Sequence, residues 1–407
     1  MKNILLFFVA VFIASSCSTE RKGNFRLQPD SKQNVTITSL EIDSVLLDSV
    51  TTSFVVSSGK CDSGVYVIDN YFCTLYRFDL NGKFKDRKLG TGRARNETTI
   101  GRIATHSFLA DGRLVRTVDT TWFVSAVNWE GRESYPEYLY DKNPFNDVYY
   151  IYNKDFLLED YFRVVYEQTN NDGSYDRDNL YEDPYSYTPV YNDNVCRSYG
   201  NNIYFKVHLA FPNCNYIHTT DEQLRQGANI LETNLEKRSL GRILSVGYPM
   251  GYYTNSLDKA IFSTVNFDIS QKGNFYVTYE ADTLIYQYDK DYNEQVCFGF
   301  AGKNMDLDYV TINTLSESRK NWRNERQTKG YYNWLEYVDE TGLLFRSYQK
   351  GKTQSTDGLQ IYKDGVLFGD VSVPKGLRVM GYVAPYCYSY VIADEEREIM
   401  YMYRFKL

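Results

Sequence analysis

Apolar and polar residues alternate over short stretches along much of the chain. Residues 64–69 and 75–80 alternate in this way, and an Asn-Gly pair follows the second stretch at 81–82. A period of two places every second side chain on one face of a strand, and Asn-Gly pairs favour tight turns between antiparallel strands. The pattern therefore predicts meanders of short antiparallel strands and little helix.

The same unit returns farther along the chain. Residues 64–92 resemble residues 274–302 without a gap, and residues 390–407 repeat the unit at the end of the sequence. Weaker copies open near residues 108, 201 and 337. The matched residues are Tyr66 with Tyr276, Val67 with Val277, Tyr76 with Tyr286, Asp79 with Asp289, and Gly92 with Gly302. Repeats of this kind indicate a stacked or radial architecture.

Repeated meanders have to pack against one another, because a single four-stranded meander leaves apolar surface uncovered. Radial packing makes a β-propeller, which leaves only short, protected sheet edges. We expect an all-β fold, a single β-propeller over residues 35–407, with six blades and seven as the alternative. Residues 35–40 alternate and lie near the N-terminus, so we expect them to complete the last blade and close the ring.

Three segments depart from the strand pattern and are expected to be insertions in loops. Residues 141–196 are rich in Asn, Asp and Tyr. Residues 221–240 place Leu224, Ile230, Leu231 and Leu235 on a loose apolar face, which predicts a helix. Residues 305–330 include a second short helix at 316–323. We expect both helices to lie on a face of the propeller as loop excursions.

The N-terminus reads as an export signal. A lysine at position 2 precedes an apolar run at 4–14, and small residues at 14–16 precede Cys17. The run is too short to span a bilayer, so residues 1–16 are expected to be a signal peptide that is removed. We expect acyl chains such as palmitate on Cys17 and a flexible tether over 17–34. An ordinary secretory signal with a chance cysteine is the less favoured alternative.

The lipobox before Cys17 and the repeat carry a resemblance. The first unit reads Val-Tyr-Val-x-Asp and then Leu-Tyr-x-Phe-Asp-x-x-Gly-Lys, and a copy ends the chain. This combination resembles the TolB-like six-bladed β-propeller lipoproteins of the Bacteroidetes over about residues 35–407. The resemblance implies an exported, lipidated propeller beside nutrient-capture machinery. We expect an outer-membrane lipoprotein that faces the periplasm or the cell surface. Its motifs are structural and imply no catalytic residue.

Composition narrows the classes of partner. The formal net charge is -7 with the signs interspersed, which argues against a nucleic-acid partner because there is no basic stripe. The 39 tyrosines and 23 phenylalanines suit strands. Six cysteines follow Cys17 without a CxxC pair, so buried free thiols are favoured, and Cys61 with Cys73 is the best candidate for a bridge.

The usual catalytic and cofactor motifs are missing from the sequence. There is no HExxH, GxSxG, Walker loop or GxGxxG, so we expect no catalytic residue, no metal and no cofactor. A metal between His208 and His218 is less favoured than packed strand histidines. The acidic segment 172–183 has the composition of a calcium loop, but its spacing departs from the EF-hand order.

Tyrosines in the middle insertion give the best positive indication of function. Tyrosine offers a flat, rigid face that stacks on sugars or anchors a protein partner. We therefore expect a non-enzymatic cell-envelope propeller that binds a glycan or an envelope protein complex. The alternatives are a carbohydrate-active hydrolase or lyase that uses carboxylates in the propeller funnel, and a scaffold with a large apolar patch. The candidate binding residues are Tyr149, Tyr150, Tyr152, Tyr161, Tyr181, Tyr185, Tyr187 and Tyr191.

Overall fold

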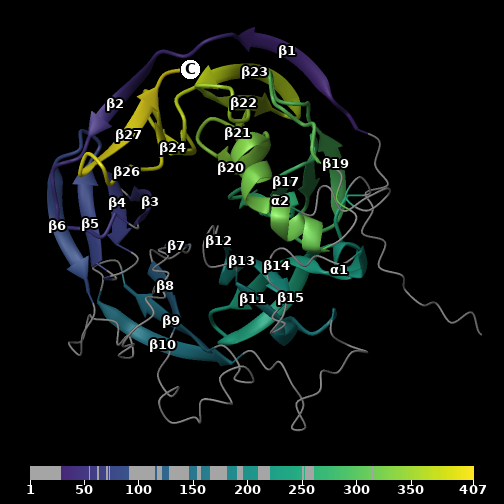
Figure 1. The fold of residues 1–407 in the computed structure, drawn as a ribbon. Helices are drawn as coiled ribbons and strands as arrows, with labels where there is room; N and C mark the ends of the chain where they lie inside the picture. The colour runs from purple at the N-terminus through teal and green to yellow at the C-terminus, as the bar shows by residue number, and fades with distance from the viewer. Residues whose placement is uncertain are drawn as a thin grey trace, which may run out of the picture.

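The computed structural model of the chain is a ring of β-sheets around a central axis (Figure 1). Because the sheets are antiparallel and repeat around the axis, the expected all-β β-propeller is confirmed. The structure describes residues 29–54, 56–61, 64–69, 72, 74–90, 115–116, 122–127, 146–153, 157–165, 181–189, 196–209, 221–249, 252, 261–310, 312 and 315–407.

The strands of the first half of the ring form three sheets in chain order. Side chains are described along most of the first and third sheets, whereas the second is described almost entirely by its backbone pairing. The strands are β3 (Val56–Cys61), β4 (Gly64–Asp69), β5 (Thr74–Asp79) and β6 (Phe84–Leu89); β7 (Val115–Arg116), β8 (Trp122–Val127), β9 (Asn146–Tyr152) and β10 (Leu158–Val165); β11 (Tyr187–Pro189), β12 (Cys196–Tyr199), β13 (Asn202–Leu209), β14 (Ala228–Asn234) and β15 (Ser239–Val246).

Three further sheets complete the ring. The first strands of successive sheets lie nearest the axis, where β12 contacts β7 and β16, β20 contacts β16 and β24, and β24 contacts β3. The strands are β16 (Val265–Ile269), β17 (Phe275–Tyr279), β18 (Ile285–Tyr288) and β19 (Glu294–Phe298); β20 (Tyr331–Val338), β21 (Leu343–Gln349), β22 (Asp357–Lys363) and β23 (Val366–Val373); β24 (Val379–Val383), β25 (Tyr386–Ser389), β26 (Ile392–Asp394) and β27 (Ile399–Phe405).

The N-terminal segment forms a strap along the outside of the ring (Figure 1). The amide of Asp30 donates to the carbonyl oxygen of Cys297 at 2.9 Å, β1 (Lys32–Ile37) pairs in parallel with β23, and β2 (Ile42–Leu46) pairs antiparallel with β27. The prediction that residues 35–40 complete the last blade is therefore wrong, because residues 35–37 belong to β1 on the preceding sheet and β2 pairs with the last one. Because Asp30 is already bonded to the fold, residues 30–34 belong to the strap and not to the tether.

The repeat seen in the sequence corresponds to matching structure. Val67 pairs with Tyr76 between β4 and β5, and Val277 pairs with Tyr286 between β17 and β18. Asp79 ends β5 and Asp289 follows β18, and the Oδ1 of each accepts two backbone N–H groups of the following turn, at 2.8 and 3.0 Å for Asp79. The distances at the other turn are both 2.9 Å. A side-chain oxygen that binds the turn amides explains why aspartate repeats here.

Aromatic and aliphatic side chains fill the spaces between neighbouring sheets. Phe345 of β21 packs edge-to-face on Phe405 of β27 with ring centroids 6.3 Å apart. Tyr276 of β17 stacks on Tyr337 of β20 at 4.9 Å. Burial of such rings is the main stabilising term in a fold whose sheets cannot cover both faces alone.

One of the two predicted helices is confirmed and the other is wrong. Helix α2 (Leu315–Thr328) covers the predicted second helix. Within 221–240, only Asp221–Gln226 is helical (α1), and β14 follows directly. Six of the seven residues of β14 are buried, so both faces of this strand are covered and its apolar residues imitate the spacing of a helical stripe.

The segment 141–196 is not one insertion. It contains β9, β10, a 3-10 turn at Pro184–Ser186 and β11, and all three strands pair within sheets. Tyrosine-rich strands lack the clear alternation of apolar and polar residues, which explains the wrong prediction. Among the described residues, no helix is long and apolar enough to cross a membrane.

Candidate functional site at the propeller axis

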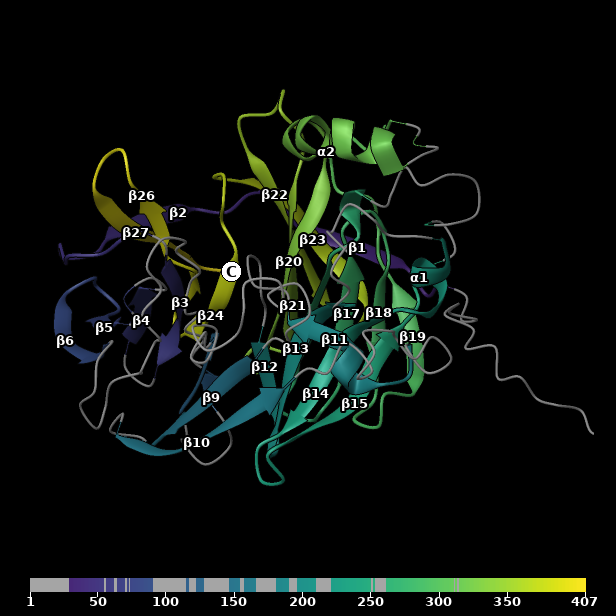
Figure 2. The same ribbon diagram turned by 60° about the horizontal axis from the view of Figure 1, so that its bottom comes forward.

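Most of the long connections leave the sheets at the same end. In an antiparallel sheet, successive connections alternate between the two ends, so connections between sheets share one end with those between the second and third strands. Helix α2 lies on this end, which we call the long-connection face (Figure 2). Connections at the opposite end include 200–201, 270–274 and 339–342. The long ones are 90–114, 128–145, 166–186, 210–227, 247–264 and 299–330.

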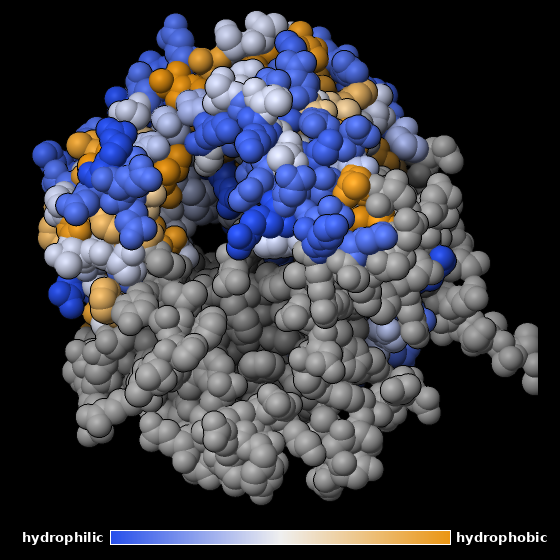
Figure 3. All heavy atoms as spheres, viewed as in Figure 1, coloured by the Kyte–Doolittle hydropathy of each residue, from blue (hydrophilic) through white to orange (hydrophobic). Residues whose placement is uncertain are grey.

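The long-connection face is hollowed near the centre of the ring (Figure 3). The described residues beside the hollow are mostly hydrophilic, with a few apolar positions exposed between them. A concave surface on a rigid scaffold is a common location for binding.

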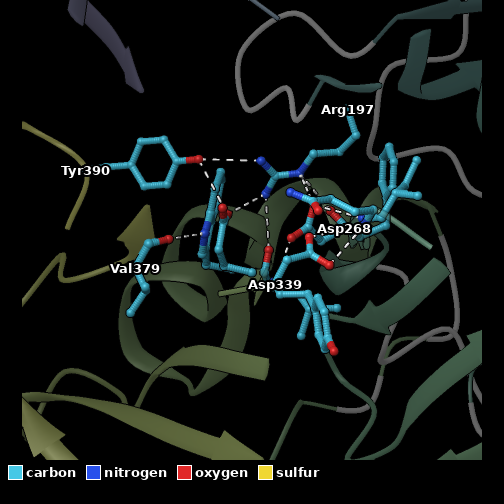
Figure 4. A network of polar contacts seen from close by, with 12 residues as sticks. Arg197, Asp268, Asp339, Val379 and Tyr390 are labelled. Atoms are coloured by element: carbon cyan, nitrogen blue, oxygen red, sulfur yellow. Dashed lines mark hydrogen bonds and ion pairs between the residues drawn. The ribbon is translucent and has the colours of Figure 1, made fainter. Parts of the chain in front are cut away.

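Four of the sheets contribute side chains to one buried cluster, which we call the axis cluster: Arg197, Asp268, Glu336 and Tyr390 (Figure 4). Arg197 Nε lies 2.9 Å from Asp268 Oδ1, and Arg197 Nη2 lies 2.7 Å from Glu336 Oε2. The hydroxyl of Tyr390 accepts from Arg197 Nη1 and donates to Glu336 Oε2, both at 3.5 Å. The Arg197, Asp268 and Glu336 side chains are only 14%, 8% and 11% exposed.

The innermost strands position these groups. Arg197 lies on β12, Asp268 on β16 and Glu336 on β20, so the ring brings together residues that are far apart in sequence. Arg197 also donates to the backbone carbonyls of Leu335 at 3.2 Å and Phe267 at 3.4 Å. One guanidinium therefore bridges three sheets through both side chains and backbone.

Asp268 is held by backbone donors as well. Its Oδ2 accepts from the amide of Tyr337 at 2.6 Å, and its Oδ1 accepts from the amide of Ile269 at 2.8 Å. Near the end of β20, Asp339 accepts from the amide of Gln271 at 3.0 Å. These bonds fix β16 to β20 on the side of the cluster away from α2.

Trp334 forms the aromatic wall of the site. Its indole N–H donates to the carbonyl of Val379 at 2.9 Å, and its ring meets Tyr390 edge-to-face at 4.6 Å. The guanidinium carbons of Arg197 and Arg378 lie 5.2 and 5.6 Å from the Trp334 ring centroid. Cation–π attraction and the ion pairs therefore act on the same guanidinium of Arg197.

Burial and the neighbouring charges shift the pKa values of the side chains in the axis cluster. Desolvation raises the pKa of Glu336 to about 8, although the nearby Arg197 lowers it. Desolvation also raises the pKa of Asp268, opposed by Arg197. Burial works to lower the pKa of Arg197, but the two carboxylates outweigh it and hold the pKa above its usual value.

The expected tyrosine site is only partly described. Tyr149, Tyr150, Tyr152 and Tyr161 lie on the paired strands β9 and β10, not on loops. The side chain of Tyr185 and all of Tyr191 lie outside the described residues.

Two other tyrosines of that set pack together. Tyr181 is partly buried, and Tyr187 is fully buried in β11. The Tyr187 hydroxyl donates to the carbonyl of Tyr181 at 3.1 Å and accepts from the amide of Ala228 at 3.0 Å. Tyr187 therefore belongs to the core in this structure.

The other chemical candidates add no site within the described chain. No group of three His, Cys, Asp or Glu residues there is arranged to hold a metal. His208 lies on β13, and His218 lies outside the described residues. Cys17 and Cys73 also lie outside them, whereas Cys387 is a buried free thiol.

Sequence reasoning missed the axis cluster. Asp268 and Glu336 occupy polar positions in alternating stretches, where a carboxylate ordinarily faces water. A weak signal was available, because each carboxylate is flanked by apolar residues on an innermost strand, in Val265–Ile269 and Tyr331–Val338.

No protein-family model and no curated protein matches the sequence. Among solved structures, a member of the DUF4221 family from Bacteroides vulgatus aligns with a TM-score of 0.56 at 9% identity, over 91% of this chain and 97% of that one. A putative exported protein from Bacteroides fragilis aligns with a TM-score of 0.48 at 14% identity, over 93% of this chain and 99% of that one. At 9% identity, the first of these likenesses supports the same overall fold and nothing finer.

Proposed function

We propose that the chain is a cell-envelope lipoprotein whose propeller binds a glycan or a protein partner on the long-connection face, without catalysis. The N-terminal signal and Cys17 support attachment to the outer membrane by acyl chains. We count each of the six sheets as one blade, in a TolB-like arrangement closed by β2.

The observation that carries this proposal is the concentration of long connections at one end of the ring. Binding residues are commonly borne on loops that a rigid scaffold positions. The axis cluster gives that face a fixed centre, because Arg197 and Tyr390 meet at the axis from opposite sides of the ring.

Burial of some of the candidate tyrosines reduces the number that a partner could contact. Tyr187 contributes its hydroxyl to the core, so it is a poor candidate for contact with a partner. Tyr191 follows β11 in the sequence and lies outside the described residues, so burial does not rule it out. We therefore propose Tyr181 and Tyr191 as the first residues to test.

Hydrolysis or elimination by two carboxylates is the second candidate. Asp268 and Glu336 are the paired acids that such chemistry would use, and the pKa of Glu336 is raised as in a general acid. However, both carboxylates bind the same guanidinium and are almost buried, which favours a structural role.

The test is a glycan array and an envelope pull-down with protein that starts at residue 18, compared with the double variant Tyr181→Ala/Tyr191→Ala. Saturable binding that the variant loses would support the proposal. Turnover of a bound glycan that Glu336→Gln abolishes would replace it with the enzymatic candidate. Absence of binding to both glycans and envelope proteins would refute a binding role.

A further inference from the structure

The axis cluster contains fewer cations than carboxylates. Arg197 is the one cation that forms ion pairs with Asp268 and Glu336 among the described residues. With both carboxylates ionised, these three side chains would carry a net charge of -1 in a site that is about nine-tenths buried. An uncompensated buried charge is costly, and such a site recovers neutrality by taking up a proton.

We propose that the axis cluster is a proton-binding latch: one proton on Glu336 completes the charge balance and holds four sheets of the ring together at the axis. The proton adds to the Glu336 carboxylate and comes from water, so no other bond is formed or broken. The protonated carboxyl becomes a donor where the carboxylate was only an acceptor.

Among the described residues, the groups that face Glu336 supply one positive charge for two carboxylates. β12 supplies Arg197, β16 supplies Asp268, and the segment after β25 supplies the Tyr390 hydroxyl. On β20 itself, Trp334 lies two residues before Glu336, and Asp339 follows the end of the strand. Arg378, before β24, is placed over the ring of Trp334, and no ion pair between it and Glu336 is present.

A proton suits this site better than a metal ion or a larger ligand. The guanidinium already lies between the two carboxylates, and its nitrogens also donate to two backbone carbonyls. A metal or an organic cation would have to displace it, whereas a proton requires no displacement. Of the two acids, Asp268 receives two backbone N–H bonds that favour its ionised form, so the proton belongs on Glu336.

The acidity of Glu336 is consistent with this assignment. Its pKa rises from 4.5 in a solvated chain to about 8 in the fold, with desolvation as the largest cause. The folded state therefore binds more protons than the unfolded state between these values. The stabilisation is complete below about pH 4.5 and is lost as the pH rises through about 8.

The experiment measures the unfolding equilibrium of the folded chain in urea from pH 5 to pH 9. For the wild-type protein, the unfolding constant should rise by up to about tenfold per pH unit for the one extra proton. Glu336→Gln, which keeps the neutral shape, should reduce this slope by one proton. Glu340→Gln is the matched control, because Glu340 lies at the surface with Lys60 and its pKa is lowered.

Equal slopes for wild type and Glu336→Gln would overturn the proposal. If Glu336→Gln does not fold, carboxyl carbon NMR of the labelled wild-type protein measures the titration of Glu336 directly. Titration above pH 7 would support the latch, and titration below pH 5 would overturn it.

Discussion

Removing the guanidinium of Arg197 should destabilise the fold more than removing any surface arginine. Arg197→Met keeps much of the apolar stem but leaves Asp268 and Glu336, both about nine-tenths buried, without their shared cation. Removing one partner of a buried ion pair costs about 3–5 kcal/mol, because the other charge remains buried. The carbonyls of Leu335 and Phe267 also lose a donor each.

The free energy of unfolding in urea at pH 7.5, followed by tryptophan fluorescence, measures this loss. Arg397→Met is the control, because the Arg397 side chain is 70% exposed beside Asp394, and its loss should cost less than about 1 kcal/mol. The triple variant Arg197→Met/Asp268→Asn/Glu336→Gln should recover a large part of the stability, because it removes the buried charge of Asp268 and the fraction of Glu336 that is ionised at this pH.

Two results would contradict this account of the axis cluster. A loss below about 1 kcal/mol for Arg197→Met would mean that the ion pairs contribute no more than surface pairs do. A triple variant no more stable than Arg197→Met would mean that packing, not charge, sets the cost.

Three further predictions concern other parts of the ring. Gly302→Ala should cost about 1–3 kcal/mol, measured as a fall in Tm, because its Cβ would lie 2.5 Å from the Tyr348 ring; an unchanged Tm would contradict the close packing. Cys387 should resist iodoacetamide in the folded protein, since burial raises the pKa of its thiol to about 12; rapid alkylation mapped to this residue by mass spectrometry would refute its burial. Deleting residues 29–40 should weaken the fold, whereas deleting 29–53 should also open the ring by removing β2; equal urea midpoints for both truncations would show that β2 does not close it.

Local sequence was sufficient to predict the kind of fold. The alternation in residues 64–69 and 75–80, the turn aspartates Asp79 and Asp289, and the second helix are local features, and each reappears in the structure. Period-two patterning and turn chemistry act over a few residues, so they can be seen without knowing the neighbours.

The predictions that fail are those that depend on which neighbouring strands pack against or pair with a segment. The pattern in β14 predicts a helix because this strand is buried on both faces. The composition of β9 and β10 predicts loop tyrosines, whereas these residues lie in paired strands. The pattern predicts that residues 35–40 complete the last blade, whereas β2 pairs with the last sheet. Both β1 and β2 alternate, and only their pairing with β23 and β27 distinguishes them.

Turn aspartates and alternating side chains act locally, so they are sufficient to predict that this chain forms repeated antiparallel meanders. The location of its chemistry depends instead on how the sheets assemble into a ring. Arg197, Asp268 and Glu336 are each ordinary polar residues on a strand, and they become a buried ionic cluster because the ring brings three innermost strands to one axis, away from water.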